Sequence, residues 1–230
     1  GGKGSRLGRH TTNKPKCLVE FDGKTLLQRQ LENYKNNKIY IIGDYKIDVL
    51  KKYIKVFFKQ YNIQVVHAKD GKGTLSGLKQ VLNIIDNLDP IVFLWSDLIL
   101  EKPLEHKESD IQVFTTNDFP CRYRLDDSNN IIKEVSTNDG IMGAFTIKNK
   151  KVLSSIPKTG SFVSGWLKDN LNKIKVVKTT ITSTSEVGEL KHLDAVYEKT
   201  TSRFFNSIEI GEKEVTKKCV DCNYAHIIAQ

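Results

Sequence analysis

The first sixteen residues hold side chains whose types suit the binding of a triphosphate. Three glycines stand within four positions, namely Gly1, Gly2 and Gly4. Glycine leaves the backbone free to take positive φ, and it lets an anion approach the N–H groups without a Cβ in the way. Ser5, Arg6 and Lys16 add a hydroxyl and two cations, which suit a triphosphate and offset the charge that builds up when it is attacked. A glycine-rich string alone would more often be a flexible turn.

A second glycine-rich stretch, from Asp70 to Leu78, leads into a predicted helix that runs to about Asp86. The start of a helix presents free N–H groups and a partial positive charge, so Gly73 and Thr74 could hold a phosphate or the edge of a base. The alternative is a glycine turn in which Thr74 is the N-cap of the helix.

Asp97 closely follows the apolar run Ile91–Trp95, which predicts a strand covered on both faces. The carboxyl end of a parallel strand lies at the crevice where open α/β sheets bind ligands, and carboxylate oxygens suit Mg²⁺. Aspartate at a strand end is also common simply as a turn former.

The elements that must position these residues alternate along the chain. Short apolar runs followed by helical patterns predict βαβ units and a parallel sheet. We expect strands over 17–21, 38–42, 64–67 and 91–95, and helices over 25–36 (capped by Thr25), 47–61 and 74–86. In the second helix we expect a core stripe, consisting of Val49, Leu50, Tyr53, Ile54 and Phe57.

From Ile111 the pattern favours antiparallel pairing. We expect short strands over 111–115, 123–125, 131–135 and 142–147, with a hairpin loop over 126–130, then a helix over 162–171, a strand over 174–181 and a helix over 190–200. Arg122, Arg124 and Lys133 could grip the phosphate of an acceptor, but paired exposed charges across a hairpin explain them equally well.

The composition is that of a soluble globular protein, with 39% hydrophobic and 27% charged residues among 230. The formal net charge is +9, but the basic residues are mostly scattered lysines without interleaved aromatics, so we do not expect a nucleic-acid partner. No apolar run is long enough to span a membrane and no signal peptide is apparent, which predicts a cytoplasmic protein without a membrane partner. The oligomeric state is not indicated.

The chain holds four cysteines, at Cys17, Cys121, Cys219 and Cys222. In a reducing cytoplasm we expect free thiols. The last two have zinc or redox spacing, but no second pair accompanies them, which favours coincidence over a metal site.

The string G-x-G-S-R-L, followed by P-K about eight residues after the leucine, resembles the signature loop of the nucleotidyltransferases that activate sugar 1-phosphates and phosphocholine. This resemblance implies a three-layer, Rossmann-like α/β fold with a mixed, mainly parallel sheet of the nucleotide-diphospho-sugar transferase type. It also implies roles for the residues already named: Arg6 and Lys16 in catalysis, Gly1, Gly2, Gly4 and Ser5 at the nucleotide, Gly73 and Thr74 at its base, and Asp97 as a ligand of Mg²⁺.

The segment Ser185–Leu190 also bears on the metal. Related enzymes often carry D-I-G-T or E-I-D at this place, and one of the carboxylates there is a second metal ligand. Glu186 matches the first position and is our candidate. Gly188 stands where the cytidylyltransferase-like version has Asp, so it cannot be a ligand.

The resemblance also concerns both ends of the chain. In the family the glycine loop follows a buried central strand, so we interpret Gly1 as a truncation point and expect a gap in the sheet where the first strand is missing. Residues 1–199 would form the transferase domain. The pattern of residues 201–218 predicts a hairpin that turns at Gly211-Glu212. This segment resembles the opening strands of a choline or aminoglycoside kinase. The alternative is that residues 200–230 form a C-terminal extension packed on the edge of the domain.

The expected reaction is transfer of a nucleoside monophosphate from an NTP to a phosphorylated small molecule, with release of pyrophosphate. One alternative is a metal-dependent glycosyltransferase that uses a nucleotide sugar. That class predicts a D-x-D pair at the metal strand, whereas Ser96-Asp97-Leu98-Ile99 offers one Asp. Another alternative is a nucleic-acid-binding module, which would show salt-dependent retention on DNA or RNA.

Overall fold

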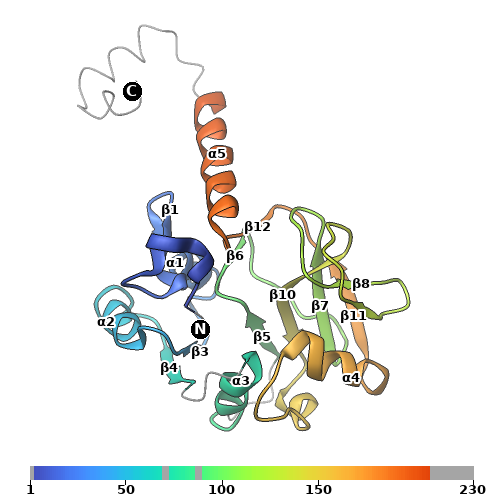
Figure 1. The fold of residues 1–230 in the computed structure, drawn as a ribbon. Helices are drawn as coiled ribbons and strands as arrows, with labels where there is room; N and C mark the ends of the chain where they lie inside the picture. Colours follow the sequence, from blue (N-terminus) through green and yellow to red (C-terminus); the bar gives the residue numbers. More distant parts are fainter. Residues whose placement is uncertain (1–2, 69–72, 86–89, 208–230) are drawn as a thin grey trace, which may run out of the picture. The chain divides into compact units, whose positions relative to one another are not determined.

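A computed structural model describes residues 3–68, 73–85 and 90–207 (Figure 1). The chain divides into two compact units, Gly1–Leu193 and Asp194–Gln230, and the sites discussed below lie in the first. Helix α5 (Leu190–Ser207) crosses this division, and the boundary that we predicted after Lys199 falls inside the same helix.

The N-terminal part of the first unit consists of short elements. The 3-10 helices η1 (Ser5–Thr11) and η2 (Lys16–Leu18) lead into the hairpin of β1 (Glu20–Phe21) and β2 (Lys24–Thr25). The strand expected over 17–21 is therefore mostly a 3-10 turn. Helix α1 (Leu26–Asn33) is shorter than predicted, but its predicted cap is confirmed, because the Thr25 hydroxyl accepts a hydrogen bond from the Gln28 N–H at 3.1 Å.

Two parallel strands follow, β3 (Ile39–Gly43) and β4 (Ile63–His67), connected through α2 (Ile47–Phe57). Leu50 and Ile54 of α2 are buried as expected. The rest of the predicted stripe was partly wrong: Val49 and Phe57 are 36% and 59% exposed. The helix ends at Phe57, and the next residue, Phe58, takes the place in the core cluster that the pattern assigned to Phe57.

The central sheet has six strands in the order β11-β7-β10-β8-β9, with β5 also paired to β10. Their bounds are β5 Ile91–Leu94, β7 Ile111–Thr116, β8 Arg124–Leu125, β9 Ile131–Ile132, β10 Gly140–Ile147 and β11 Val176–Thr180. The sheet is mixed, as predicted. It is not mainly parallel in its pairing, because β10 lies between β5 and β7 and is antiparallel to both; only β11 pairs in parallel, with β7.

The core of this sheet is aromatic on the side of α3 (Thr74–Leu82) and of the π-helical segment η4 (Phe162–Leu167), which continues into α4 (Lys168–Asn170). Phe162 is fully buried, and its ring packs on Phe93, Phe145 and Trp166 with centroid separations of 4.9 to 5.6 Å. The remaining short helices are η3 (Lys150–Leu153) and η5 (Leu171–Lys173). A helix was thus predicted at the right place, although most of it is π-helical.

Two further pairs complete the sheets that the structure describes. β6 (Leu98–Leu100) pairs antiparallel with β12 (Thr184–Glu186), and β3–β4 stands apart from β5 with no ladder between them. The missing first strand stays a prediction. Within the described residues, no helix has both the length and the apolar character that crossing a membrane requires.

The C-terminal prediction was wrong in part. Residues 201–207, which we expected to begin a hairpin, continue α5. Extending an existing helix requires no new nucleation, and this outweighs the strand preference of Thr and Phe. The turn at Gly211-Glu212, the kinase-like segment, Cys219 and Cys222 lie outside the described residues.

Candidate active site

The two carboxylates predicted to bind a metal lie on neighbouring segments. Asp97 directly precedes β6, and Glu186 is the last residue of β12, where it stands opposite Leu98. The Val187 N–H donates a hydrogen bond to the Asp97 carbonyl at 2.9 Å. The structure therefore brings Asp97 and Glu186 together, although Glu186 ends a strand and does not begin a helix as we expected.

Helix α1 holds the segment around Asp97 in place. The Gln30 amide donates to the carbonyls of Trp95 and Leu98, at 2.8 and 3.2 Å, and the Asn33 amide donates to the Leu100 carbonyl at 3.0 Å. These bonds satisfy backbone carbonyls on both sides of Asp97. We did not predict them, because a polar residue in a short helix carries no sign of its distant partner.

Lys16 is the cation of the site. Its ammonium forms an ion pair with Asp97 Oδ2, and the two side chains are only 13% and 14% exposed. Gly4 packs against Lys16: φ at Gly4 is +65°, and a Cβ there would lie 3.0 Å from Lys16 Cβ. The glycine loop thus supports Lys16 directly.

Asp97 keeps one acceptor free. Its Oδ1 is buried without a hydrogen-bond partner among the described residues, while Oδ2 pairs with Lys16. A buried carboxylate oxygen left without a partner is costly unless a ligand or ion satisfies it. This atom is the observation in the structure that fits a bound cation.

Glu186 lies in an environment that disfavours its charge. Burial raises the pKa of this carboxyl above its ordinary value, and the negative charge of Asp97 raises it further, whereas Lys16 and His192 act in the opposite direction. His192 Nδ1 lies 2.5 Å from Glu186 Oε2. His192 was not predicted, because a lone histidine near a helix start gives no signal in the sequence.

The number of protein ligands is small. Within the part of the chain that the structure describes, no group of three or more His, Cys, Asp or Glu residues could hold a metal by itself. Asp97 and Glu186 offer two carboxylates. Mg²⁺ is commonly held by one or two carboxylates together with substrate phosphates and water, so this donor set fits Mg²⁺ on a nucleotide.

The remainder of the glycine loop is compact. Gly1 and Gly2 lie outside the described residues, and Ser5 is exposed at the start of η1. The Thr11 hydroxyl donates to the Gly4 carbonyl at 3.0 Å. Arg6 is 50% exposed and its guanidinium pairs with Glu189, so Arg6 would have to exchange this partner to contact a phosphate.

Gly73 and Thr74 stand at the start of α3, next to a loop that contains Gly160. At Gly73 φ is +85°, and a Cβ would lie 2.7 Å from the Gly160 carbonyl carbon and closer still to its oxygen. The Thr74 hydroxyl accepts a hydrogen bond from the Phe162 N–H at 2.9 Å. The N-cap position belongs to Gly73, so the alternative in which Thr74 caps the helix was wrong.

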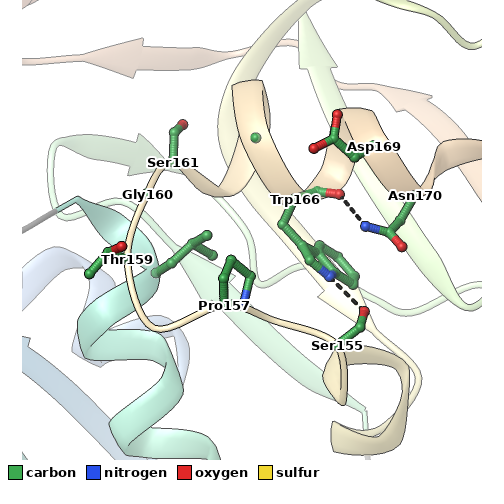
Figure 2. A pocket seen from close by; sticks show the side chains of 10 residues that line it. Ser155, Pro157, Thr159, Gly160, Ser161, Trp166, Asp169 and Asn170 are labelled. Carbon is green, nitrogen blue, oxygen red and sulfur yellow. Dashed lines mark hydrogen bonds between the residues drawn. The ribbon is translucent and has the colours of Figure 1, made fainter.

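A pocket of about 290 Å³ adjoins this contact (Figure 2). Figure 2 shows Trp166 at its wall, where the indole N–H donates to the Ser155 hydroxyl at 2.9 Å. Asp169 is the one charged residue of its lining, which is Leu75, Ser155, Pro157, Thr159, Gly160, Ser161, Gly165, Trp166, Asp169 and Asn170. A lining with a carboxylate and no cation does not suit a phosphate.

The basic residues considered for the acceptor lie on the hairpin of β8 and β9. Arg124 Nε pairs with Glu134 at 2.7 Å, which is the cross-hairpin pairing that we gave as the alternative. Arg122 and Lys133 are exposed. The hairpin loop itself is confirmed, since the Asp126 carboxylate accepts hydrogen bonds from the N–H groups of Ser128 and Asn130.

Comparison with known proteins agrees with this fold. Residues 1–105 match the family model of the MobA-like NTP transferase domain. The mannose-1-phosphate guanylyltransferase catalytic subunit beta of Xenopus tropicalis is 31% identical over 54% of this chain and 38% of its own length. The chain spans less than half the length of this relative and of the mannose-1-phosphate guanyltransferase of Saccharomyces cerevisiae, which it also matches.

Two solved structures share the fold over most of the chain. CTP:phosphocholine cytidylyltransferase from Streptococcus pneumoniae has a TM-score of 0.71 at 21% identity, with 86% of this chain and 95% of that one covered. HddC from Yersinia pseudotuberculosis, complexed with GMP-PN, has a TM-score of 0.69 at 19% identity, with 87% and 96% covered.

These solved structures show that the chain has the α/β fold of nucleotidyltransferases. Residues 1–105 are thus similar to the MobA-like NTP transferase domain, and the curated relatives named above are mannose-1-phosphate guanylyltransferases.

Proposed function

We propose that this protein transfers a nucleoside monophosphate from an NTP to a phosphorylated small molecule, either a sugar 1-phosphate or a phosphocholine-like alcohol phosphate. A phosphate oxygen of the acceptor attacks the α-phosphorus, a new P–O bond forms, and the bond to the β-phosphate breaks. Pyrophosphate leaves with that electron pair. The observation that carries the proposal is the meeting of Lys16, Asp97 and Glu186, two of which are more than 80 positions from Lys16 in the sequence.

The residues of the chain divide the work between binding and charge compensation. Asp97 and Glu186 would hold Mg²⁺, which supplies charge neutralisation on the triphosphate. Lys16 would leave Asp97 Oδ2 and contact the α-phosphate, where a cation gains most as charge accumulates in the transition state. Arg6 and the N–H groups around Gly4 would bind the outer phosphates.

The remaining assignments are also part of the proposal. Gly73 and Thr74 would frame the base, and the close approach of Gly160 to Gly73 gives this segment a fixed form. A three-layer arrangement in which a further strand lies between β3 and β5 would close the central sheet. The nucleotide complex of the HddC structure supports an NTP as one substrate.

The test is release of pyrophosphate by the full chain, with each of four NTPs crossed with sugar 1-phosphates and phosphocholine. With the combination of NTP and acceptor that gives turnover, Asp97→Asn should lower kcat at least about 100-fold, and Mn²⁺ should restore part of the lost activity. Asp127→Asn is the matched control, since the Asp127 side chain is fully exposed. Turnover of a nucleotide sugar to a glycoside, without pyrophosphate, would instead identify a glycosyltransferase.

A further inference from the structure

Glu186 is held by two neighbours that play no part in the reaction as proposed so far. One is His192, in the first turn of α5, whose Nδ1 lies 2.5 Å from Oε2. The other is Gly188, two residues along the chain. Both contacts concern the carboxylate itself, so together they decide where its oxygens point.

The contact at Gly188 depends on the lack of a side chain. A Cβ at this position would lie 2.8 Å from Glu186 Cδ and 3.1 Å from Oε2, and closer still to Oε1. Real Cβ atoms essentially never lie within 3.0 Å of another non-bonded heavy atom, so the contacts with Oε1 and Cδ could not persist. The Glu186 carboxylate therefore occupies the space that any other residue at 188 would fill.

The backbone does not require glycine at this position. Gly188 is not among the described glycines with positive φ, which are Gly4, Gly8, Gly23, Gly73, Gly143 and Gly160. An alanine could take the same backbone conformation without strain. Among the described residues, the atoms nearest to a Cβ at 188 all belong to the Glu186 carboxylate, so space for this carboxylate accounts for the glycine.

His192 fixes the other oxygen. When the Glu186 carboxyl is ionised it only accepts hydrogen bonds, and Nδ1 then carries the proton and donates it to Oε2. The side chains of His192 and Glu186 are 19% and 18% exposed, so water competes weakly for this bond. Oε1, which has no partner among the described residues, remains free to bind a ligand.

We propose that Gly188 and His192 are positioning residues for Glu186: His192 holds Oε2, and the missing Cβ at Gly188 leaves the space in which Oε1 is presented to a divalent cation beside Asp97. This inference rests on the proposed function, because it takes Asp97 and Glu186 as the ligands. Residues that orient a ligand typically contribute 10- to 100-fold to metal affinity. It also explains why Gly188 stands where a carboxylate was expected: the longer Glu186 side chain fills that space.

Gly188→Ala is a clean test because the atom that must move is the end of a flexible side chain. The variant should fold and keep the melting temperature of the wild type, while its Glu186 carboxylate turns away. We would titrate the full chain with Mn²⁺ alone and follow free Mn²⁺ by its EPR signal. The Kd for Mn²⁺ should rise about 10- to 100-fold. Gly165→Ala is the matched control, since no atom lies within 4 Å of a Cβ there.

Two variants of His192 separate positioning from packing. Asn places an amide N–H where histidine has Nδ1, so His192→Asn should keep the Kd within about threefold, whereas His192→Ala should raise it about tenfold. Equal Kd values for Gly188→Ala and Gly165→Ala, or for His192→Ala and His192→Asn, would overturn the proposal. Loss of turnover with every NTP would count against the proposed function alone, because the Mn²⁺ titration does not depend on it.

Discussion

Replacing Lys16 by methionine should move metal binding and turnover in opposite directions. In the structure the Lys16 ammonium occupies Asp97 Oδ2, one of the oxygens that a cation would use. Methionine keeps most of the length of the side chain and removes its charge. The variant should bind Mn²⁺ more tightly than the wild type but transfer the nucleotide more slowly, because in the proposed mechanism the cation that competes with the metal also stabilises the transition state.

The size of the first effect follows from Coulomb's law. A unit charge and a divalent ion about 5 Å apart repel by about 1.7 kcal/mol even at the dielectric constant of water. This energy corresponds to more than about tenfold in Kd. The Lys16 and Asp97 side chains are mostly buried, where the dielectric constant is lower, so tenfold is the lower limit that we expect.

The free energy of unfolding of the Lys16→Met variant should also depend on the metal. Without metal, the variant leaves both oxygens of Asp97 without a described partner, which should lower the free energy of unfolding by about 1–3 kcal/mol. Adding Mn²⁺ should restore it. Urea unfolding with and without Mn²⁺ measures this difference, and the pyrophosphate assay gives kcat.

Lys24→Met is the matched control, since the Lys24 ammonium pairs with Glu32 at 2.9 Å on the exposed surface. It should change neither the Kd for Mn²⁺ nor kcat. A Lys16→Met protein with weaker Mn²⁺ binding, or with unchanged kcat, would refute the role given to Lys16.

Two further predictions concern other parts of the first unit. Gly73→Ala should destabilise the protein by about 2–4 kcal/mol in urea unfolding, because φ is +85° and the added Cβ would meet the Gly160 backbone. The control is Gly23→Ala, which should cost only about 1 kcal/mol, because φ is +71° but no atom lies within 4 Å of the added Cβ. Equal losses of stability in the two variants would mean that the Gly160 contact is unimportant. Burial raises the pKa of Cys17 to about 11 and that of Cys121 to about 12. Both thiols should therefore resist iodoacetamide at pH 8 until the chain is unfolded in urea, as followed by mass spectrometry of their peptides. The stability that the two protonated thiols contribute is present below pH 9 and should be lost as the pH rises toward 11. Rapid labelling of either thiol in the native protein would contradict the burial.

The predictions that rested on local sequence patterns were the most reliable ones. The Thr25 cap, the Asp126 loop and the positions of β3, β4 and β7 each depend on residues close together in the chain, and the structure has them where they were expected. Asp97 follows β5 as expected, but β5 pairs antiparallel with β10 in the described residues, whereas we expected a parallel strand.

Features that depend on distant partners were missed. Glu186 ends a strand because it pairs with β6, and nothing near Glu186 in the sequence announces that pairing. The antiparallel position of β10 between β5 and β7, the bonds from Gln30, and the contact of His192 with Glu186 are likewise tertiary contacts. Residues 201–207 show the opposite error, in which strand propensity was followed although a helix already ran into the segment.

The pairing of β6 with β12 also has a consequence for the order of folding. It joins Leu98–Leu100 to Thr184–Glu186, so a long loop must close before the two carboxylates can meet. Loop closure of this length is entropically unfavourable, and contacts of high sequence separation slow folding. The first half of the chain, as it leaves the ribosome, therefore already carries Lys16 and Asp97 but cannot assemble the site. The proposed metal site is therefore complete only when β12, the last strand of the described residues, docks on β6.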